Sequence, residues 1–252
     1  MNNKENQKVA VVTGGTRGIG RAITKELLEK GLKVFALFAR NSKAAESLAE
    51  EAQVLEGELI LLRGDITRED KFAEVIAAIK DQTDFIDVVV HSAASGVHRE
   101  ANELSLKHLK WTFEINVFSI HHLLTSLFPL LRENSRVIGI SSNGAQRVLP
   151  YYTSVGSSKG ALESLFRHYA REWAPKGIAV NCICPGMVMT EATNAFPDRE
   201  ERIQQCISMT PTGSMTTPED VAQLVSFLAL NSASRQIVGQ TIVLDGGKGL
   251  LA

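Results

Sequence analysis

The sequence predicts an α/β fold, in which about seven strands form a doubly wound parallel sheet with helices on both faces. Short apolar runs alternate with amphipathic helical segments along almost the whole chain, as is typical of parallel strands joined by helical crossovers. The 252 residues are 44% hydrophobic and 22% charged, which is enough for one sizeable core. There is no repeat, low-complexity tract or long linker, so we expect residues 1–252 to form a single domain.

The apolar runs and the helical periodicity locate the expected elements. Strands are predicted over 8–13, 34–39, 58–63, 86–90, 136–140, 178–184 and 241–244. Helices are predicted over 21–30, 44–52, 69–80, 104–131 and 152–173, the fourth as one long helix or a broken pair. Residues 191–209 are helical in pattern, rich in charge and interrupted at Pro197. We expect a substrate lid around 190–209, with an ordinary pair of surface helices as the alternative.

Composition gives expectations about partners and location. The net charge of −1 and a pI of about 6.6 indicate neither a nucleic-acid partner nor a membrane surface. The N-terminal residues are polar, and the longest apolar runs are too short for a membrane span, so a cytoplasmic location is expected. Cys182, Cys184 and Cys206 are interpreted as buried thiols, with no metal site.

A glycine-rich segment follows the first predicted strand and precedes the first predicted helix. It runs Gly14-Gly15-Thr16-Arg17-Gly18-Ile19-Gly20. Glycines let the backbone approach a pyrophosphate, and the start of a helix offers free N–H groups to it. In this context the segment predicts a Rossmann-type dinucleotide site, with an ordinary glycine-rich turn as the alternative.

The end of the second strand indicates which dinucleotide is bound. An acidic residue there would accept a hydrogen bond from the ribose 2′-hydroxyl of NAD, whereas a basic residue would pair with the 2′-phosphate of NADP. The segment contains Arg40 and Lys43 and no acid, and Arg17 in the glycine-rich segment is a second candidate cation. We expect NADPH as cofactor; alternatively, Arg40 and Lys43 only solvate the start of a helix.

A phenol and an ammonium are expected on one helical face. Tyr152 precedes Lys159 by seven residues, which in a helix turn about 700°, close to two full turns. Tyr151 would point about 100° away and would pack or line a substrate path. The alternative is that both tyrosines are structural.

With Asn116 and Ser142 between these two motifs, the sequence resembles the short-chain dehydrogenase/reductase family over essentially its whole length. Asp65-Ile66 is similar to the family's adenine contact, the segment 185–190 to the nicotinamide flank, and Asp245-Gly246-Gly247 to the end of the last strand. The cofactor-binding residues that the motifs and this resemblance imply are Gly14, Thr16, Arg17, Gly18, Ile19, Gly20, Arg40, Asp65, Ile66, Ala93, Lys159, Pro185, Gly186, Val188 and Thr190.

Two positions depart from the family pattern. His91-Ser92-Ala93-Ala94 stands where Asn-Asn-Ala-Gly is common, and His91 is either a hydrogen-bonding substitute or a packed neutral imidazole. Val155 occupies the usual tyrosine position, so that Tyr152-(x)6-Lys159 replaces Tyr-(x)3-Lys. This spacing is similar to that of enoyl-acyl-carrier-protein reductases, and the chain looks most similar to their NADPH-dependent type III form.

The resemblance implies reduction of a trans-2-enoyl thioester in fatty-acid synthesis, with hydride added to the β-carbon. Tyr152 would then stabilise the charge on the thioester oxygen, and Lys159 would favour its phenolate and bind the nicotinamide ribose. Ser142 would assist or serve as a turn hydroxyl, and Asn116 would make a structural contact near the lysine. Tyr151, Ala195 and Phe196 are the expected substrate contacts.

Three alternative functions remain open at this point. One is a 3-ketoacyl-thioester or other carbonyl reductase of the same family. Another is a reductase for a specialised secondary-metabolite enone. The third is a catalytically silent NADP-binding sensor or scaffold. The expected partner is an enoyl thioester on acyl carrier protein, and residues 162–173 are expected to contribute to a four-helix interface of a homotetramer.

Overall fold

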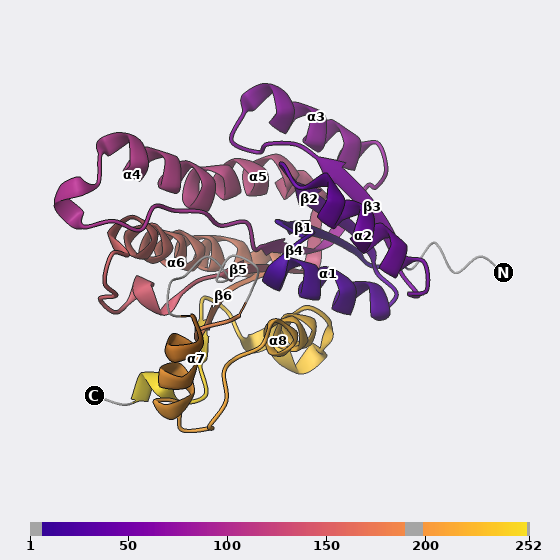
Figure 1. Cartoon of the computed structure of the whole chain (residues 1–252). Coiled ribbons are helices and arrows are strands. Elements are labelled where there is room, and N and C mark those ends of the chain that lie inside the picture. The colour runs from indigo at the N-terminus through magenta and orange to yellow at the C-terminus, as the bar shows by residue number, and fades with distance from the viewer. Residues whose placement is uncertain (1–6, 190–198, 251–252) are drawn as a thin grey trace.

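The computed structural model describes residues 7–189 and 199–250. In this part of the chain, seven parallel strands form one sheet in the order β3-β2-β1-β4-β5-β6-β7. The strands are β1 (Val9–Thr13), β2 (Lys33–Phe38), β3 (Glu58–Arg63), β4 (Ile86–His91), β5 (Leu131–Ile140), β6 (Ala179–Pro185) and β7 (Thr241–Leu244). The predicted α/β class and the doubly wound parallel sheet are confirmed (Figure 1).

Helices cover both faces of the sheet, because alternate strand residues point to opposite sides. Val9 and Val11 belong to the core under α3 (Glu69–Lys80), α5 (Ser119–Leu127) and α6 (Thr153–Trp173). Ala10 and Val12 belong to the core under α1 (Gly18–Glu29) and α8 (Pro218–Leu230). Figure 1 shows α3 and α5 on one side of the strands and α1 and α8 on the other. The remaining α-helices of the described chain are α2 (Ser42–Ala52), α4 (Leu106–Phe113) and α7 (Arg199–Ser208).

The helix predicted over 104–131 is a broken one. A π turn (Glu114–Phe118) separates α4 from α5, and a 3₁₀ turn (Phe128–Leu130) ends the segment. Pro129 lies in that turn, and proline cannot continue a helix because it lacks the N–H donor. The prediction was wrong at its C-terminal end, because β5 begins at Leu131 and not at residue 136.

The strand order reverses between β1 and β4, and the two loops that leave these strands meet above the sheet. A Cβ on Gly14 would lie 2.9 Å from Cα of Ala93, so only glycine allows the loops to come this close. In open parallel sheets, ligands bind in the crevice at such a reversal, beyond the carboxyl ends of the strands.

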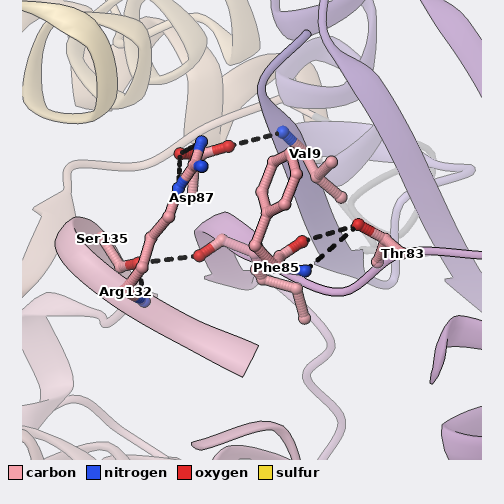
Figure 2. A network of polar contacts seen from close by, with 7 residues as sticks. Val9, Thr83, Phe85, Asp87, Arg132 and Ser135 are labelled. Carbon is pink, nitrogen blue, oxygen red and sulfur yellow. Dashed lines mark hydrogen bonds and ion pairs between the residues drawn. The ribbon is translucent and has the colours of Figure 1, made fainter. Parts of the chain in front are cut away.

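At the opposite, amino-terminal ends of the strands, a buried carboxylate joins neighbouring strands (Figure 2). Asp87 accepts hydrogen bonds from the backbone N–H of Val9 at 2.8 Å and from Nε and Nη2 of Arg132 at 3.0 and 2.6 Å. The Ser135 hydroxyl donates to the carbonyl of Ile86 at 2.7 Å. These bonds tie together the N-terminal ends of β1, β4 and β5.

The apolar side chains of α6 do not form an exposed face. Leu162, Phe166 and Trp173 are buried in the protein's own core. The expected contribution of residues 162–173 to a homotetramer interface stays a prediction. The exposed aromatic side chains of the neighbouring segment are Trp111 and Phe118. Within the described ranges, no helix combines the length and the apolar character that crossing a lipid bilayer requires.

Candidate active site

The glycine-rich loop has the geometry that an anion site requires. Gly14 and Gly18 have positive φ angles of 66° and 50°, and a Cβ on Gly20 would overlap the Gly14 carbonyl. Helix α1 begins within the loop, at Gly18, and its N-cap residue Arg17 makes no side-chain capping bond. The first N–H groups of α1 are therefore available to a ligand. These residues fit a dinucleotide pyrophosphate, and Thr16 and Ile19 are packed beneath the loop.

Two exposed cations flank this loop. Arg17 lies at the start of α1, and Arg40 lies just after β2, in the segment that leads to α2. Within the described part of the chain, neither guanidinium is engaged in a hydrogen bond or an ion pair. Both guanidinium groups are therefore available to bind a phosphate.

The other predicted cofactor residues also lie at carboxyl ends of strands. Asp65 follows β3 and accepts from the N–H and hydroxyl of Thr67 at 3.1 and 2.6 Å, which shapes its own turn. Ile66 is partly buried against the core. Pro185 ends β6, Gly186 donates to the Leu244 carbonyl, and Val188 is buried. Thr190, Ala195 and Phe196 lie in the part of the predicted lid, residues 190–198, that is outside the described residues. The rest of the predicted lid consists mainly of α7.

Tyr152 is the N-cap of α6 and not a residue within the helix, which corrects the sequence interpretation. Tyr151 before it has a φ of 60°, so the chain turns sharply before the helix begins at Thr153. The Tyr152 carbonyl accepts the first helical bond, from the Gly156 N–H at 2.7 Å. The seven-residue helical geometry assumed for Tyr152 and Lys159 was therefore wrong.

The Tyr152 hydroxyl lies 3.1 Å from the Ser142 hydroxyl, and either can be the donor. The structure thus brings together the two predicted hydroxyls, at the end of β5 and the start of α6. The ring packs against Gly144, where a Cβ would overlap it. Gly144 is a site residue that sequence reasoning missed, although a glycine two residues after Ser142 was a visible signal.

Burial dominates the acidity of Tyr152. It raises the pKa of the phenol, the hydrogen bond from Ser142 opposes that change, and the nearby Cys184 thiol adds to it. The sequence-based expectation was that Lys159 would favour the phenolate; Lys159 is not among the groups that shift this pKa, and the direction is the opposite. Burial therefore favours the neutral phenol of Tyr152 over the phenolate.

Lys159 is buried, and its Nζ donates to the Ile140 carbonyl at 2.7 Å. Burial lowers the pKa of Lys159 to about 8, against the opposing effects of Cys182, Cys184 and Glu163. Cys182 and Cys184 are buried free thiols, as predicted, and burial raises the pKa of each. Among the described residues, no group of His, Cys, Asp and Glu side chains could hold a metal ion.

Asn116 lies in the π turn and its side chain is fully used. Oδ1 accepts from the Ser95 N–H at 2.9 Å, and Nδ2 donates to the Ser95 carbonyl and to the Ser158 hydroxyl, both at 2.9 Å. Asn116 therefore joins the loop after β4 to α6 beside Lys159, which agrees with the structural contact expected for it.

His91 ends β4 and is completely buried. Its Nδ1 is 2.9 Å from the Thr13 hydroxyl, and that hydroxyl accepts from the Ala93 N–H at 3.1 Å. Among the described residues, Nε2 has no hydrogen-bond partner. Burial, and secondarily the Lys159 charge, lower the pKa of His91 to about 3. His91 is thus a neutral, packed imidazole that also makes a hydrogen bond, so the two sequence interpretations hold together.

Val155 and Tyr151 complete the site. Val155 is buried against Gly96, where an added Cβ would overlap the valine side chain. This position therefore contributes an apolar packing contact and no hydroxyl group. Tyr151 is 57% exposed, which favours the second of the two expectations for it, a place beside a substrate path, over packing. Its contribution to a substrate path stays a prediction.

A family comparison agrees with this geometry. Residues 14–248 match the sequence profile of a family described as enoyl-(acyl carrier protein) reductase. The chain belongs to the short-chain dehydrogenase/reductase family. It is an oxidoreductase of that family, whose members bind NAD(P).

Known proteins resemble the chain over nearly its full length. It is 30% identical over 244 residues to a 3-oxoacyl-[acyl-carrier-protein] reductase of Synechocystis, covering 95% of this chain and 96% of that one. A short-chain dehydrogenase/reductase from Serratia marcescens has a TM-score of 0.88 at 29% identity, covering 96% and 97% of the two chains. The RhlG/NADP active-site complex of Pseudomonas aeruginosa has a TM-score of 0.87 at 28% identity, covering 96% of each chain.

Proposed function

We propose that the protein reduces the carbon–carbon double bond of a trans-2-enoyl thioester with NADPH. The main observation in support of this proposal is the position of the Tyr152 phenol. Val155 fills the family's usual tyrosine position against Gly96, and Tyr152 provides its hydroxyl from the N-cap of α6 instead. A donor displaced in this way suits a thioester oxygen, which lies three bonds from the β-carbon that accepts hydride, whereas a ketone oxygen lies one bond from the carbon that accepts hydride.

Each of the active-site residues has its own role in the proposed reaction. Tyr152 donates a hydrogen bond to the substrate oxygen on which negative charge develops. The Ser142 hydroxyl, 3.1 Å from the Tyr152 hydroxyl, either orients Tyr152 or donates to the same oxygen. Lys159 exchanges its bond to Ile140 for the ribose hydroxyls of the dinucleotide. The dinucleotide, when bound, supplies the hydride.

The free arginines favour NADPH over NADH. Arg17 and Arg40 are exposed beside the glycine-rich loop, and a guanidinium binds phosphate through paired donors. The NADP complex of the similar Pseudomonas aeruginosa protein is consistent with this assignment. Acyl carrier protein as the thioester carrier, a homotetrameric assembly and a cytoplasmic location belong to the same proposal.

The second candidate is reduction of a 3-oxoacyl thioester, and the named relatives favour it over the enoyl substrate. The Synechocystis protein and a protein of Staphylococcus epidermidis, each 30% identical, are 3-oxoacyl-[acyl-carrier-protein] reductases. The pair of hydroxyls on Ser142 and Tyr152 would also suit a ketone oxygen. Both candidates therefore need the same donors and differ in the carbon that is reduced.

One assay distinguishes these functions. The purified protein is given NADPH or NADH with crotonyl or acetoacetyl thioester, each on coenzyme A and on acyl carrier protein, and dinucleotide oxidation is followed. The proposal predicts turnover of the crotonyl substrate with NADPH. Turnover of only the acetoacetyl substrate would establish the second candidate, and NADPH binding without any turnover would favour a silent sensor or scaffold.

A further inference from the structure

Helix α6 carries a buried carboxylate that the proposed chemistry does not use. Glu163 is 3% exposed. Its Oε1 accepts from the Ser141 hydroxyl at 2.6 Å, and its Oε2 accepts from Nε2 of Gln146 at 3.0 Å. A buried carboxylate is costly unless it is hydrogen-bonded, so these two bonds account for how the fold accommodates it.

Both partners of Glu163 lie in the segment that bears Ser142. Ser141 comes directly after β5, and Gln146 follows the 3₁₀ turn (Asn143–Ala145) that begins at Ser142. Glu163 thus bonds both ends of the six residues 141–146. A further bond, from the Cys184 thiol to Oδ1 of Asn143 at 3.1 Å, holds the middle of this segment.

Three side chains, from the N-cap of α6 to its middle, bond three consecutive residues at the end of β5. Lys159 donates to the carbonyl of Ile140, Glu163 accepts from Ser141, and Tyr152 meets Ser142. Ser142 is extended, with φ −157° and ψ 151°, so the side chains of Ser141 and Ser142 point to opposite sides. The bond from Ser141 to Glu163 therefore anchors the backbone from which the Ser142 side chain projects on the other side.

Glu163 does not act by pairing with Lys159. The two residues are one helical turn apart, yet among the described side chains no ion pair joins them. The Lys159 ammonium is bonded to Ile140 instead. The direct contacts of the carboxylate are thus with the segment 141–146.

We propose that Glu163 is a positioning residue, which holds the segment 141–146 against α6 so that Ser142 and Tyr152 present paired hydroxyls to the substrate oxygen. The proposal rests on the proposed reductase function for its kinetic consequence. Its structural consequence, the ordering of residues 141–146, is measurable without any substrate.

The test compares four variants. Glu163→Leu removes both bonds, and Gln146→Ala removes one bond at an exposed residue where folding is not at risk. Glu163→Gln keeps both bonds, because its amide oxygen accepts from Ser141 and its amide nitrogen donates to the oxygen of a rotated Gln146 side chain. Glu172→Leu is the matched control, since it removes a carboxylate from the exposed side of the same helix.

Three quantities are measured: kcat and KM for the thioester that the wild type reduces, NADPH affinity by fluorescence, and hydrogen–deuterium exchange of peptides covering 140–149. For Glu163→Leu we expect kcat to fall about 10- to 100-fold, as for a misplaced catalytic group, with NADPH affinity within about twofold and faster exchange. Gln146→Ala shows a smaller change in the same direction. Glu163→Gln stays within about threefold of wild type, and Glu172→Leu matches it.

Two results would overturn the proposal. One is wild-type kcat and exchange in both Glu163→Leu and Gln146→Ala. The other is a Glu163→Gln variant as impaired as Glu163→Leu, which would assign the effect to charge and not to the two bonds. If the wild type reduces no thioester, the proposed function fails, whereas the exchange measurement still decides whether Glu163 orders the segment.

Discussion

Buried charged groups are accommodated differently at the two ends of the strands. The amino-terminal ends are called the N-terminal edge of the sheet below, and the carboxyl-terminal ends the C-terminal edge. At the N-terminal edge, Asp87 pairs directly with Arg132 and also accepts from the Val9 backbone (Figure 2). At the C-terminal edge, Lys159 and Glu163 are both buried, yet each bonds the end of β5 and not the other. One edge thus satisfies its charges by pairing them, and the other keeps them apart.

Because of this difference, we expect the N-terminal edge to contribute mainly to stability and the C-terminal edge mainly to activity. A direct ion pair at the C-terminal edge would occupy the Lys159 ammonium, which in the proposed mechanism exchanges its bond to Ile140 for the dinucleotide. The same edge holds the unpaired Nε2 of His91 and the left-handed backbone of Tyr151. Strain and incomplete bonding of this kind collect at functional sites, where the surrounding fold maintains them. Substitutions at the two edges should therefore change different measured quantities.

The largest expected effect is on the rate at the C-terminal edge. Tyr152→Phe removes the donor to the substrate oxygen, and kcat should fall about 100-fold or more. The free energy of unfolding should change by about 1 kcal/mol or less, because the hydroxyl bonds only Ser142. Steady-state kinetics and urea unfolding measure the two quantities. Undiminished turnover would remove Tyr152 from the mechanism, and Tyr151→Phe serves as the control.

The second effect is on stability at the N-terminal edge. Asp87→Ala leaves the Val9 N–H and the Arg132 guanidinium without their acceptor, and the free energy of unfolding should fall by about 2 kcal/mol. Turnover by the folded protein should stay within about twofold, because the site lies at the other edge. Asp84→Ala, which removes an exposed acid from the loop before β4, is the control for urea unfolding. Unchanged stability with lost activity would reverse the proposed division.

The third effect is a pH dependence from Lys159. Its pKa of about 8 means that the ammonium is charged below this pH and neutral above it. NADPH affinity should therefore weaken as pH rises through about 8, approaching tenfold per pH unit. Fluorescence titrations between about pH 7 and 9.5 measure this fall, which Lys159→Arg should remove because a guanidinium stays charged. A flat wild-type profile would contradict the assigned role.

The smallest effect concerns backbone strain before α6. Tyr151 holds a φ of 60°, a region that costs a side-chain-bearing residue about 1–2 kcal/mol and glycine almost nothing. Tyr151→Gly should therefore raise the free energy of unfolding by about 1 kcal/mol, whereas Tyr151→Ala, which keeps a Cβ, should not. Thermal unfolding compares them. Equal stability of the two variants would show that this turn stores no strain.

The fold was largely predictable from the sequence because apolar periodicity marks buried strands and helix faces directly. The glycine-rich loop was also predictable, since its glycines stand between a strand and a helix. The helical geometry of Tyr152 was not, because nothing in the sequence marks Tyr151 as left-handed. Glu163 was overlooked because a carboxylate in an amphipathic helix usually faces solvent, and only the folded chain shows Ser141 and Gln146 beside it.

The position of the Tyr152 hydroxyl relative to a bound substrate shows directly whether Tyr152 stabilises the thioester oxygen. A crystal structure with NADP⁺ and an unreactive enoyl-thioester analogue would measure it. The account predicts that Oη of Tyr152 lies about 2.6–3.2 Å from the thioester oxygen, with Val155 still packed on Gly96. A thioester oxygen bonded by other groups, with Oη of Tyr152 turned away from it, would contradict the account.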